Sequence, residues 1–356
     1  MKANKKAIFY HTITSLYIVS SPSSFASIVR GDINYQYFRD FAENKGEFSV
    51  GSRNITIYNK EGNSVGTMLP NIPMIDFSVV NSNGGFATLT APQYVVSVAH
   101  NGGYTGVQFG AVAANHPDNH TFTYQLVHNN NYQVNETHPY NKDYQFARLR
   151  KLVTEVTPID SIPEVNAFPY RNDQKRYPVV LRAGGGTQKV RENGQDKWIA
   201  GPYAFLTGSA TPRSEWTWVT QQSFPVYYRK PDGNFMGDLY GPMVSVGLPG
   251  DSGSGVFVYD TVEQKWWLLA TTQSLYSSGK GNLTLLTRKD YHDEIKNNNS
   301  NPVINNTSPN TLWVWQHIEN NGQDQLISSE QTYLIDTYNE TLSTGGGANS
   351  TSAQLR

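Results

Sequence analysis

The sequence predicts an all-β fold in which short antiparallel strands close into barrels or pack as a sandwich. Short runs rich in β-branched and aromatic residues recur from residue 27 to about residue 290, and Gly, Asn, Asp and Pro turn signals bound them. Few segments repeat apolar residues with the 3.6-residue period of a helix. Many short strands joined by frequent turns are typical of closed or sandwiched antiparallel architectures.

The first 26 residues are predicted to be an export signal. They combine a basic start with a mostly apolar run, Ala7–Val19, and with small residues at Ser24 and Ala26. A basic, then apolar, then small-residue order is typical of a leader that is removed, here before Ser27. The alternative interpretation is a frayed N-terminal segment.

The β-rich region after this leader contains several strand patterns and two short helical patterns. The helix candidates are Tyr35–Glu43 and Asp290–Lys296, and the clearest strand candidates are Asn54–Tyr58, Tyr94–Val98, Tyr177–Leu181 and Gly255–Tyr259.

The composition changes near residue 296. The segment Lys296–Pro309 is crowded with Asn, Ser and Pro, which predicts a linker. Two strand-like runs follow, Thr311–Trp315 and Thr332–Asp336, but two lone strands cannot form a stable core unaided. We therefore expect one domain over residues 27–295, and a linker with the start of a second, truncated element over residues 296–356.

Composition excludes several classes of protein. The 28 Lys and Arg residues balance 29 Asp and Glu residues, so no basic field is present to hold a nucleic acid. No apolar run approaches the roughly 20 residues of a membrane-spanning helix. The chain has no cysteine, which excludes disulfides, a thiol nucleophile and thiolate metal sites. The absence of crosslinks also suits a chain that passes unfolded through a narrow pore.

The strongest chemical signal is the segment Gly250–Ser254, with the sequence GDSGS, ahead of a predicted strand. A serine hydroxyl becomes a nucleophile when a base removes its proton, and the oxygen of the attacked carbonyl then needs donors aimed at it. The glycines allow a tight turn that exposes the amides of Gly250 and Ser252 as such an oxyanion hole. The alternative interpretation is a plain Gly/Ser hairpin turn.

A base and a carboxylate complete the predicted catalytic triad. His100 directly follows an apolar strand, which sets its imidazole at the rim of a barrel. Asp143 precedes another strand-like segment and would orient that imidazole, with Asp118 and Asp160 as rivals in polar loops. The chain order His100, Asp143, Ser252 is that of chymotrypsin-type barrels and differs from the orders of subtilisins and α/β-hydrolases.

Five stretches give the chain a resemblance to the serine protease autotransporters of Gram-negative bacteria. That family includes the IgA-specific serine endopeptidases and the enterobacterial secreted toxins and mucinases. The stretches keep the family's order and are Tyr35–Gly46, Pro73–Ser78, Tyr94–Gly103, Lys151–Pro158 and Gly250–Ser254.

The resemblance implies a chymotrypsin-like double β-barrel protease domain followed by a right-handed parallel β-helix stem and a C-terminal outer-membrane barrel. It assigns the triad to His100, Asp143 and Ser252. We expect the chain to hold the protease head and the first rungs of a truncated stem. One departure is Gly255, where the family usually has Pro. Another is the short, plain leader, which is similar to that of the IgA-protease branch.

In chymotrypsin-like folds the substrate pocket is floored about six residues before the serine and walled by a strand about nineteen residues after it. The resemblance therefore implies a substrate pocket near Val246, Thr271 and Gln273. No acidic residue floors this pocket, so a small or apolar residue before the cleaved bond is expected rather than Arg or Lys. Asp251 is open to two interpretations: a turn former, or a carboxylate that pairs with a newly freed N-terminus, as in ordinary chymotrypsin-like zymogens.

Taken together, these features predict an exported serine endopeptidase that cleaves extracellular or host proteins through an acyl-enzyme. It would be a monomer, secreted or surface-exposed by way of the periplasm, with no metal or organic cofactor. His116 and His120 flank Pro117, which favours a surface loop over a zinc site. The alternatives are a non-enzymatic adhesin or ligand-binding passenger on the same scaffold, and an inactive remnant.

Overall fold

A computed structural model describes the protein over residues 28–110, 123–132, 142–150, 153, 156–163, 168–201, 203–210, 223–227, 242–247, 250–276, 281–300, 316–317 and 324–325. Strands dominate this part of the chain, and the α-helices are α1 (Tyr35–Ala42), α2 (Phe168–Asn172) and α4 (Lys289–Ser300). The strands are β1 (Ile28–Arg30), β2 (Ile55–Tyr58), β3 (Ser64–Met68), β4 (Thr88–Ala91), β5 (Tyr94–Val98), β6 (Gly106–Val107), β7 (Tyr124–His128), β8 (Tyr144–Leu149), β9 (Val180–Gly184), β10 (Gln188–Glu192), β11 (Gln195–Ala200), β12 (Thr207–Ala210), β13 (Ser223–Tyr227), β14 (Ser245–Val246), β15 (Gly255–Asp260), β16 (Lys265–Tyr276), β17 (Gly281–Leu286), β18 (Gln316–His317) and β19 (Asp324–Gln325).

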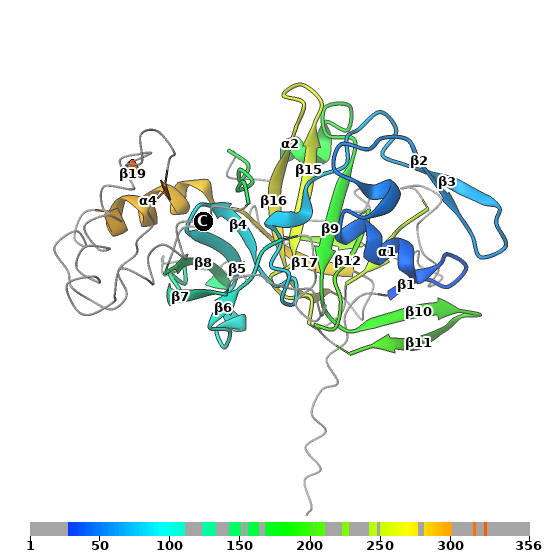
Figure 1. Ribbon diagram of the computed structural model, residues 1–356, viewed down its shortest axis with the longest axis horizontal. Helices are drawn as coiled ribbons and strands as arrows, with labels where there is room; N and C mark the ends of the chain where they lie inside the picture. Colours follow the sequence, from blue (N-terminus) through cyan, green and yellow to red (C-terminus); the bar gives the residue numbers. More distant parts are fainter. Residues whose placement is uncertain are drawn as a thin grey trace, which may run out of the picture.

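Two antiparallel sheets lie side by side and form the body of the molecule (Figure 1). The first has the strand order β4-β5-β8-β7-β6, and the second has the order β12-β9-β15-β16-β17-β13. Strand β16 of the second sheet packs against β5 of the first. The junction between these sheets is therefore made by strands far apart in the sequence.

A smaller sheet and a hairpin flank this body. The sheet β11-β10-β1-β14 places β1 parallel to β10 and antiparallel to β14. The hairpins β2–β3 and β10–β11 extend from the side of the second sheet (Figure 1).

The central strands are buried on both faces. Every residue of β5, β8, β9 and β15 is buried, so their sequences are nearly continuous apolar runs rather than alternating ones. Two of these strands nevertheless carry buried arginines, Arg148 and Arg182. Since a buried charge needs a partner, we expect polar or acidic groups to lie next to these two arginines.

Helix α1 begins where the Asn34 side chain caps it by accepting a hydrogen bond from the Gln36 N–H at 3.0 Å. Its buried face includes Phe41, whose ring lies 5.6 Å from that of Phe77. Phe77 in turn lies 5.5 Å from Phe257 of β15. This chain of rings fixes α1 on the second sheet.

Helix α4 packs against the first sheet through His292. This imidazole is buried, stacks on Phe146 at 3.8 Å between ring centroids, and shares a 2.6 Å hydrogen bond with the Tyr144 hydroxyl. Burial, with Lys296 nearby, holds the pKa of His292 well below its usual range. The neutral imidazole is therefore the form that fits this contact.

Most of the predicted elements are confirmed. Both helix candidates correspond to α1 and α4, and three of the four strand candidates correspond to β2, β5 and β15. The fourth begins later than predicted, at Val180, because Tyr177 closes a turn with its N–H on the Asp173 carbonyl and Pro178 has no N–H to donate.

Helix α4 extends further than the predicted helix and includes Lys296–Ser300, the first residues of the segment predicted as a linker. The boundary between the two predicted parts of the chain stays a prediction. The predicted leader and the predicted strands at 311–315 and 332–336 lie outside the described residues. Within the described part, no helix has the length and apolar character needed to span a membrane.

Candidate active site

The register between β5 and β8 brings His100 and Asp143 together. These antiparallel neighbours pair Val98 with Tyr144. His100 lies two residues past the end of β5, and Asp143 lies one residue before the start of β8. The two residues, which are far apart in sequence, therefore meet at one edge of the sheet.

The contact between these residues is double. The Asp143 carboxylate accepts a hydrogen bond from the His100 backbone N–H at 2.8 Å, and its other oxygen lies 2.7 Å from His100 Nδ1. Because a carboxylate only accepts, Nδ1 carries the proton of this hydrogen bond, and in the neutral imidazole the lone pair is then on Nε2. The His100 side chain is 47% exposed and that of Asp143 is 18% exposed, so the basic nitrogen is accessible while its partner is sheltered.

Ser252 lies in a tight turn just before β15. Gly250 and Gly253 have φ values of 102° and 84°, a region that favours glycine. A Cβ at Gly253 would also collide with the Phe86 carbonyl oxygen and the Ser97 hydroxyl. The turn formed by the GDSGS sequence therefore requires glycine at residue 253.

The backbone donors of this turn divide into two groups. The Gly253 N–H bonds the Thr272 carbonyl at 2.7 Å, and the Ser254 N–H bonds the Asp251 carbonyl at 2.9 Å. The first bond attaches the second half of the turn to β16, and the second closes the turn internally. The predicted oxyanion donors are the N–H groups of the other half, those of Gly250 and Ser252.

Asn101, which has no role predicted from the sequence, joins the loop of His100 to the turn of Ser252. Its side-chain amide donates a 2.6 Å hydrogen bond to the Ser252 carbonyl, which connects the loop of His100 to the turn of Ser252. No sequence signal separates this Asn from the many loop asparagines, since its importance depends on a contact between two sheets.

The Ser252 hydroxyl donates a 3.1 Å hydrogen bond to the Gln273 carbonyl, not to His100. The Gln273 side-chain amide donates at 2.9 Å to Asp143 Oδ2. Gln273, predicted as a pocket residue, thus contacts two of the three predicted triad members.

Asp251 lies under the turn and is fully buried. Its carboxylate forms a 2.8 Å ion pair with Arg182 of β9, and its second oxygen accepts the Gly186 N–H at 3.3 Å. The sequence left two roles open for Asp251, a turn former or a partner of a freed N-terminus. The structure shows a third arrangement, in which the Asp251 carboxylate pairs with an internal arginine.

Of the two rival carboxylates, Asp160 lies at the surface, where its carboxylate is 3.0 Å from the Lys265 ammonium, and Asp118 lies outside the described residues. Val246 pairs its backbone with Ile28 of β1, and Thr271 is buried in β16 opposite Gly255. The pocket assignment of Val246, Thr271 and Gln273 stays a prediction.

No group of three or more His, Asp and Glu side chains that could hold a metal ion occurs among the described residues. His116 and His120 lie outside them.

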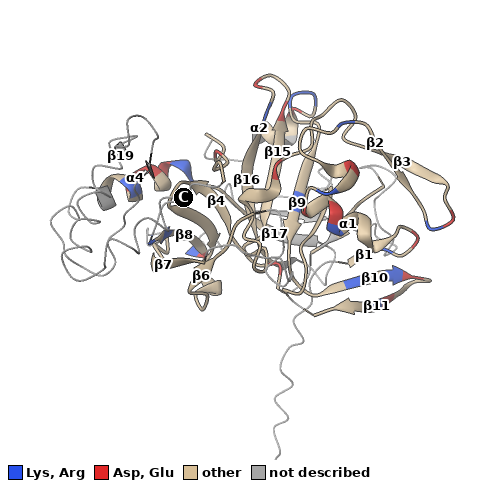
Figure 2. Ribbon diagram, viewed as in Figure 1, with Lys and Arg blue, Asp and Glu red and all other residues tan. Residues whose placement is uncertain are grey.

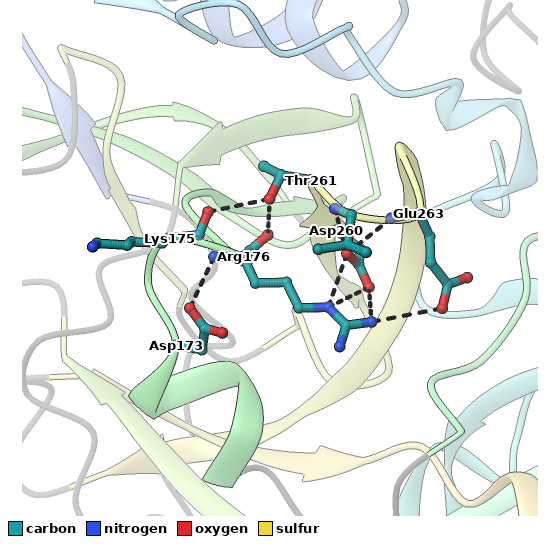
Figure 3. Close-up of polar contacts among 7 residues, drawn as sticks. Asp173, Lys175, Arg176, Asp260, Thr261 and Glu263 are labelled. Atoms are coloured by element: carbon teal, nitrogen blue, oxygen red, sulfur yellow. Dashed lines mark hydrogen bonds and ion pairs between the residues drawn. The ribbon is translucent and has the colours of Figure 1, made fainter.

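A second polar cluster lies away from this site, where the loop after α2 meets the β15–β16 hairpin (Figure 3). Arg176 donates to both carboxylate oxygens of Asp260 at 2.7–3.0 Å. Burial alone would raise the pKa of Asp260, but the hydrogen bonds from Arg176 and from the N–H groups of Glu263 and Val262 outweigh it and lower the pKa. This cluster closes a hairpin and carries no catalytic group.

Comparison with protein families gives one match that covers most of the chain. The model of the peptidase S6 family, described as Immunoglobulin A1 protease, matches residues 26–290.

Several curated relatives are similar to the chain. It is 47% identical over 266 residues to an adhesion and penetration protein autotransporter of Haemophilus influenzae, covering 74% of this chain and 18% of that protein. It is 32% identical over 340 residues to the serine protease EatA of Escherichia coli O78:H11, covering 93% and 23%. It is 33% identical over 313 residues to an immunoglobulin A1 protease autotransporter of H. influenzae, covering 75% and 20%. The chain therefore spans about a fifth of the length of these relatives.

One solved structure is also similar. The crystal structure of the Haemophilus influenzae Hap adhesin matches with a TM-score of 0.66 and 43% identity, over 75% of this chain and 28% of that one. The mostly β architecture is thus shared with the Hap adhesin.

Proposed function

Because the chain belongs to the immunoglobulin A1 protease family, peptidase S6, we propose that it is the protease domain of an exported serine endopeptidase. The observation that carries the proposal is the double contact of Asp143 with His100, on a loop that Asn101 ties to the turn of Ser252. This arrangement orients the His100 imidazole with Nδ1 toward Asp143, and Asn101 links its loop to the glycine-permitted turn of Ser252.

In the proposed reaction the Ser252 oxygen attacks a peptide carbonyl while His100 Nε2 takes the hydroxyl proton. Asp143 keeps the imidazole in the required tautomer and stabilises its protonated form. The amides of Gly250 and Ser252 hold the negative oxygen of the tetrahedral intermediate. His100 then returns the proton to the leaving amine, and water, activated by the same base, releases the acyl group.

The finer assignments belong to the same proposal. The two adjoining antiparallel sheets would form a chymotrypsin-like double barrel over residues 27–295. A leader at 1–26 would precede it, and a linker with the first rungs of a β-helix stem would follow over residues 296–356. The domain would be secreted or surface-exposed and would act on extracellular proteins. Acidic and basic residues are interspersed along the ribbon of the described part (Figure 2).

The pocket near Val246, Thr271 and Gln273 favours a small or apolar residue before the cleaved bond, because no acidic residue is among them. A cleavage profile on a peptide library that is dominated by Arg or Lys would contradict this assignment.

The second candidate function is adhesion. It is favoured by the printed names of similar proteins, an adhesion and penetration protein and the Hap adhesin. A binding role places no demand on His100, Asp143 and Ser252, whereas hydrolysis needs all three.

A fluorophosphonate probe separates the two candidates. The protein is expected to form a covalent adduct that is absent in Ser252→Ala, and this variant should lower peptide hydrolysis by about 10⁴-fold or more while its melting temperature stays unchanged. A folded protein that is never labelled would contradict the protease and leave adhesion as the function.

A further inference from the structure

The buried ion pair between Arg182 and Asp251 lies directly beneath the predicted nucleophile. Arg182 is the third residue of β9, and Asp251 immediately precedes Ser252. The two side chains are 1% and 0% exposed, and their charged atoms are 2.8 Å apart. A buried pair of this kind is rarely retained for stability alone, since apolar residues of similar volume often serve as well.

The guanidinium holds more than one part of the site. Its Nη2 donates a 2.9 Å hydrogen bond to the Ser245 hydroxyl in β14. Ser245 also hydrogen-bonds to Ser209 of β12, at 2.5 Å. Arg182 therefore connects the turn that carries Gly250 and Ser252 to the strand that carries Val246, where the substrate pocket is predicted.

The sequence of β9 is adapted to this contact. A Cβ at Gly184 would collide with the Asp251 carboxylate and with Ser254, so the glycine leaves room for the carboxylate beside the strand. The pairing of β9 with β15, which sets Ala183 opposite Gly255, keeps the two charges in register. The position of Asp251 thus follows from the sheet itself.

We infer that Arg182 is a positioning residue that acts through Asp251: it is a permanent internal counter-ion that holds the oxyanion turn in its active shape, so that no newly freed N-terminal amine is required. This inference rests on the proposed function. The reason is electrostatic, because a buried carboxylate needs a nearby cation, and here that cation is encoded in β9. The turn would then form as the chain folds, without a cleavage step.

The pH dependence of labelling distinguishes a guanidinium from an amine. Arginine keeps its proton throughout the accessible range, whereas a free α-amino group loses its proton near pH 8 and lysine near pH 10.4. The wild-type full chain is therefore expected to keep its rate of fluorophosphonate labelling between pH 8 and pH 11. Arg182→Lys is expected to label more slowly and to lose a further factor of about five over the same interval, because a lysine with a pKa near 10.4 is mostly deprotonated at pH 11.

Two other variants complete the test. Arg182→Met, which leaves Asp251 without this cation, is expected to label at least 100-fold more slowly than the wild type at a temperature where circular dichroism shows it folded. Arg176→Met is the matched control, because it removes another arginine that pairs with a buried aspartate, Asp260, outside the site. This control should label at the wild-type rate.

The outcomes are separable. A wild type that never labels contradicts the proposed function, and this inference with it. A wild type that labels, together with Arg182→Met at the same rate, overturns the inference alone. If Arg182→Met does not fold, Arg182→Lys decides: an alkaline profile identical to that of the wild type, or a wild type that itself loses activity near pH 8, overturns the inference.

Discussion

At the scale of single residues, Gln273 has the most contacts with the predicted triad. Its side chain donates to Asp143 and its carbonyl accepts from Ser252. The neutral amide gives Asp143 a donor without adding a charge. A polar side chain in a strand is a weak sequence signal, and only the packing of β16 against β5 shows which carboxylate it reaches.

Gln273→Glu should change the pH dependence of catalysis. The substitution replaces a donor to Asp143 with a second carboxylate, which favours the protonated form of the nearby imidazole. Since His100 must be neutral to accept the serine proton, the acid limb of the kcat/KM profile is expected to move to higher pH by about one unit. Gln273→Met, without the charge, should lower kcat and leave the acid limb near its wild-type position. Coincident profiles for Gln273→Glu and the wild type would contradict this role.

The absence of a Cβ at Gly253 allows the turn of Ser252 to pack closely against Phe86. Gly253→Ala places a Cβ at φ 84° against the backbone oxygen of Phe86, which cannot move aside as a flexible side chain could. The left-handed conformation alone costs a non-glycine residue about 1–2 kcal/mol, and the collision adds to it. Gly62→Ala is the matched control, because its φ is 83° and nothing lies within 4 Å of the added atom.

Both glycine variants should therefore be destabilised in chemical denaturation, and Gly253→Ala by at least about 2 kcal/mol more than Gly62→Ala. Only Gly253→Ala should also lose fluorophosphonate labelling. Equal losses of stability in the two variants would show that the collision with Phe86 is relieved in some other way.

At the scale of elements, the strand register determines which site residues could be predicted. His100 and Asp143 follow from the sequence because an antiparallel pair brings the end of one strand to the start of its neighbour. The roles of Arg182 and Asn101 do not follow from the sequence. Their partners, Asp251 and Ser252, lie in a turn far away along the chain, and a local sequence pattern does not indicate such a partner. The late start of β9 has a local cause, the turn at Tyr177 and Pro178. This turn is hard to predict because both residues belong to a run that is typical of a strand.

The attachment of α4 to β8 predicts how stability depends on pH. His292 is neutral in the folded protein, with its pKa held below the usual 6.5, whereas the unfolded chain binds a proton near that value. Stability is therefore complete above about pH 6.5 and is lost as the pH falls below it, by up to about 1.4 kcal/mol per pH unit. His292→Gln should be less stable at pH 7.5 and should lose less on going from pH 6.5 to pH 5. An unchanged slope in this variant would assign the acid sensitivity to other groups.

At the scale of the whole molecule, the mostly β architecture could be predicted from turn spacing and strand composition. The order of the two sheets could not, because it depends on contacts between strands about 170 residues apart, such as β5 and β16. The family assignment rests on residues 26–290, and the chain spans about a fifth of the length of its relatives. Hydrolysis and adhesion are therefore separable questions, because a surface used for adhesion need not include Ser252.

The docking of His292 on Tyr144 has a mechanical consequence. Tyr144 is the residue next to Asp143, so tension applied to the C-terminal end of α4 would be transmitted to the backbone that carries the Asp143 carboxylate, the partner of His100. A handle attached beyond Ser300 in a single-molecule pulling experiment would load this contact before it loads the turn of Ser252. The contact between Asp143 and His100 would then be lost under force before the protein unfolds globally.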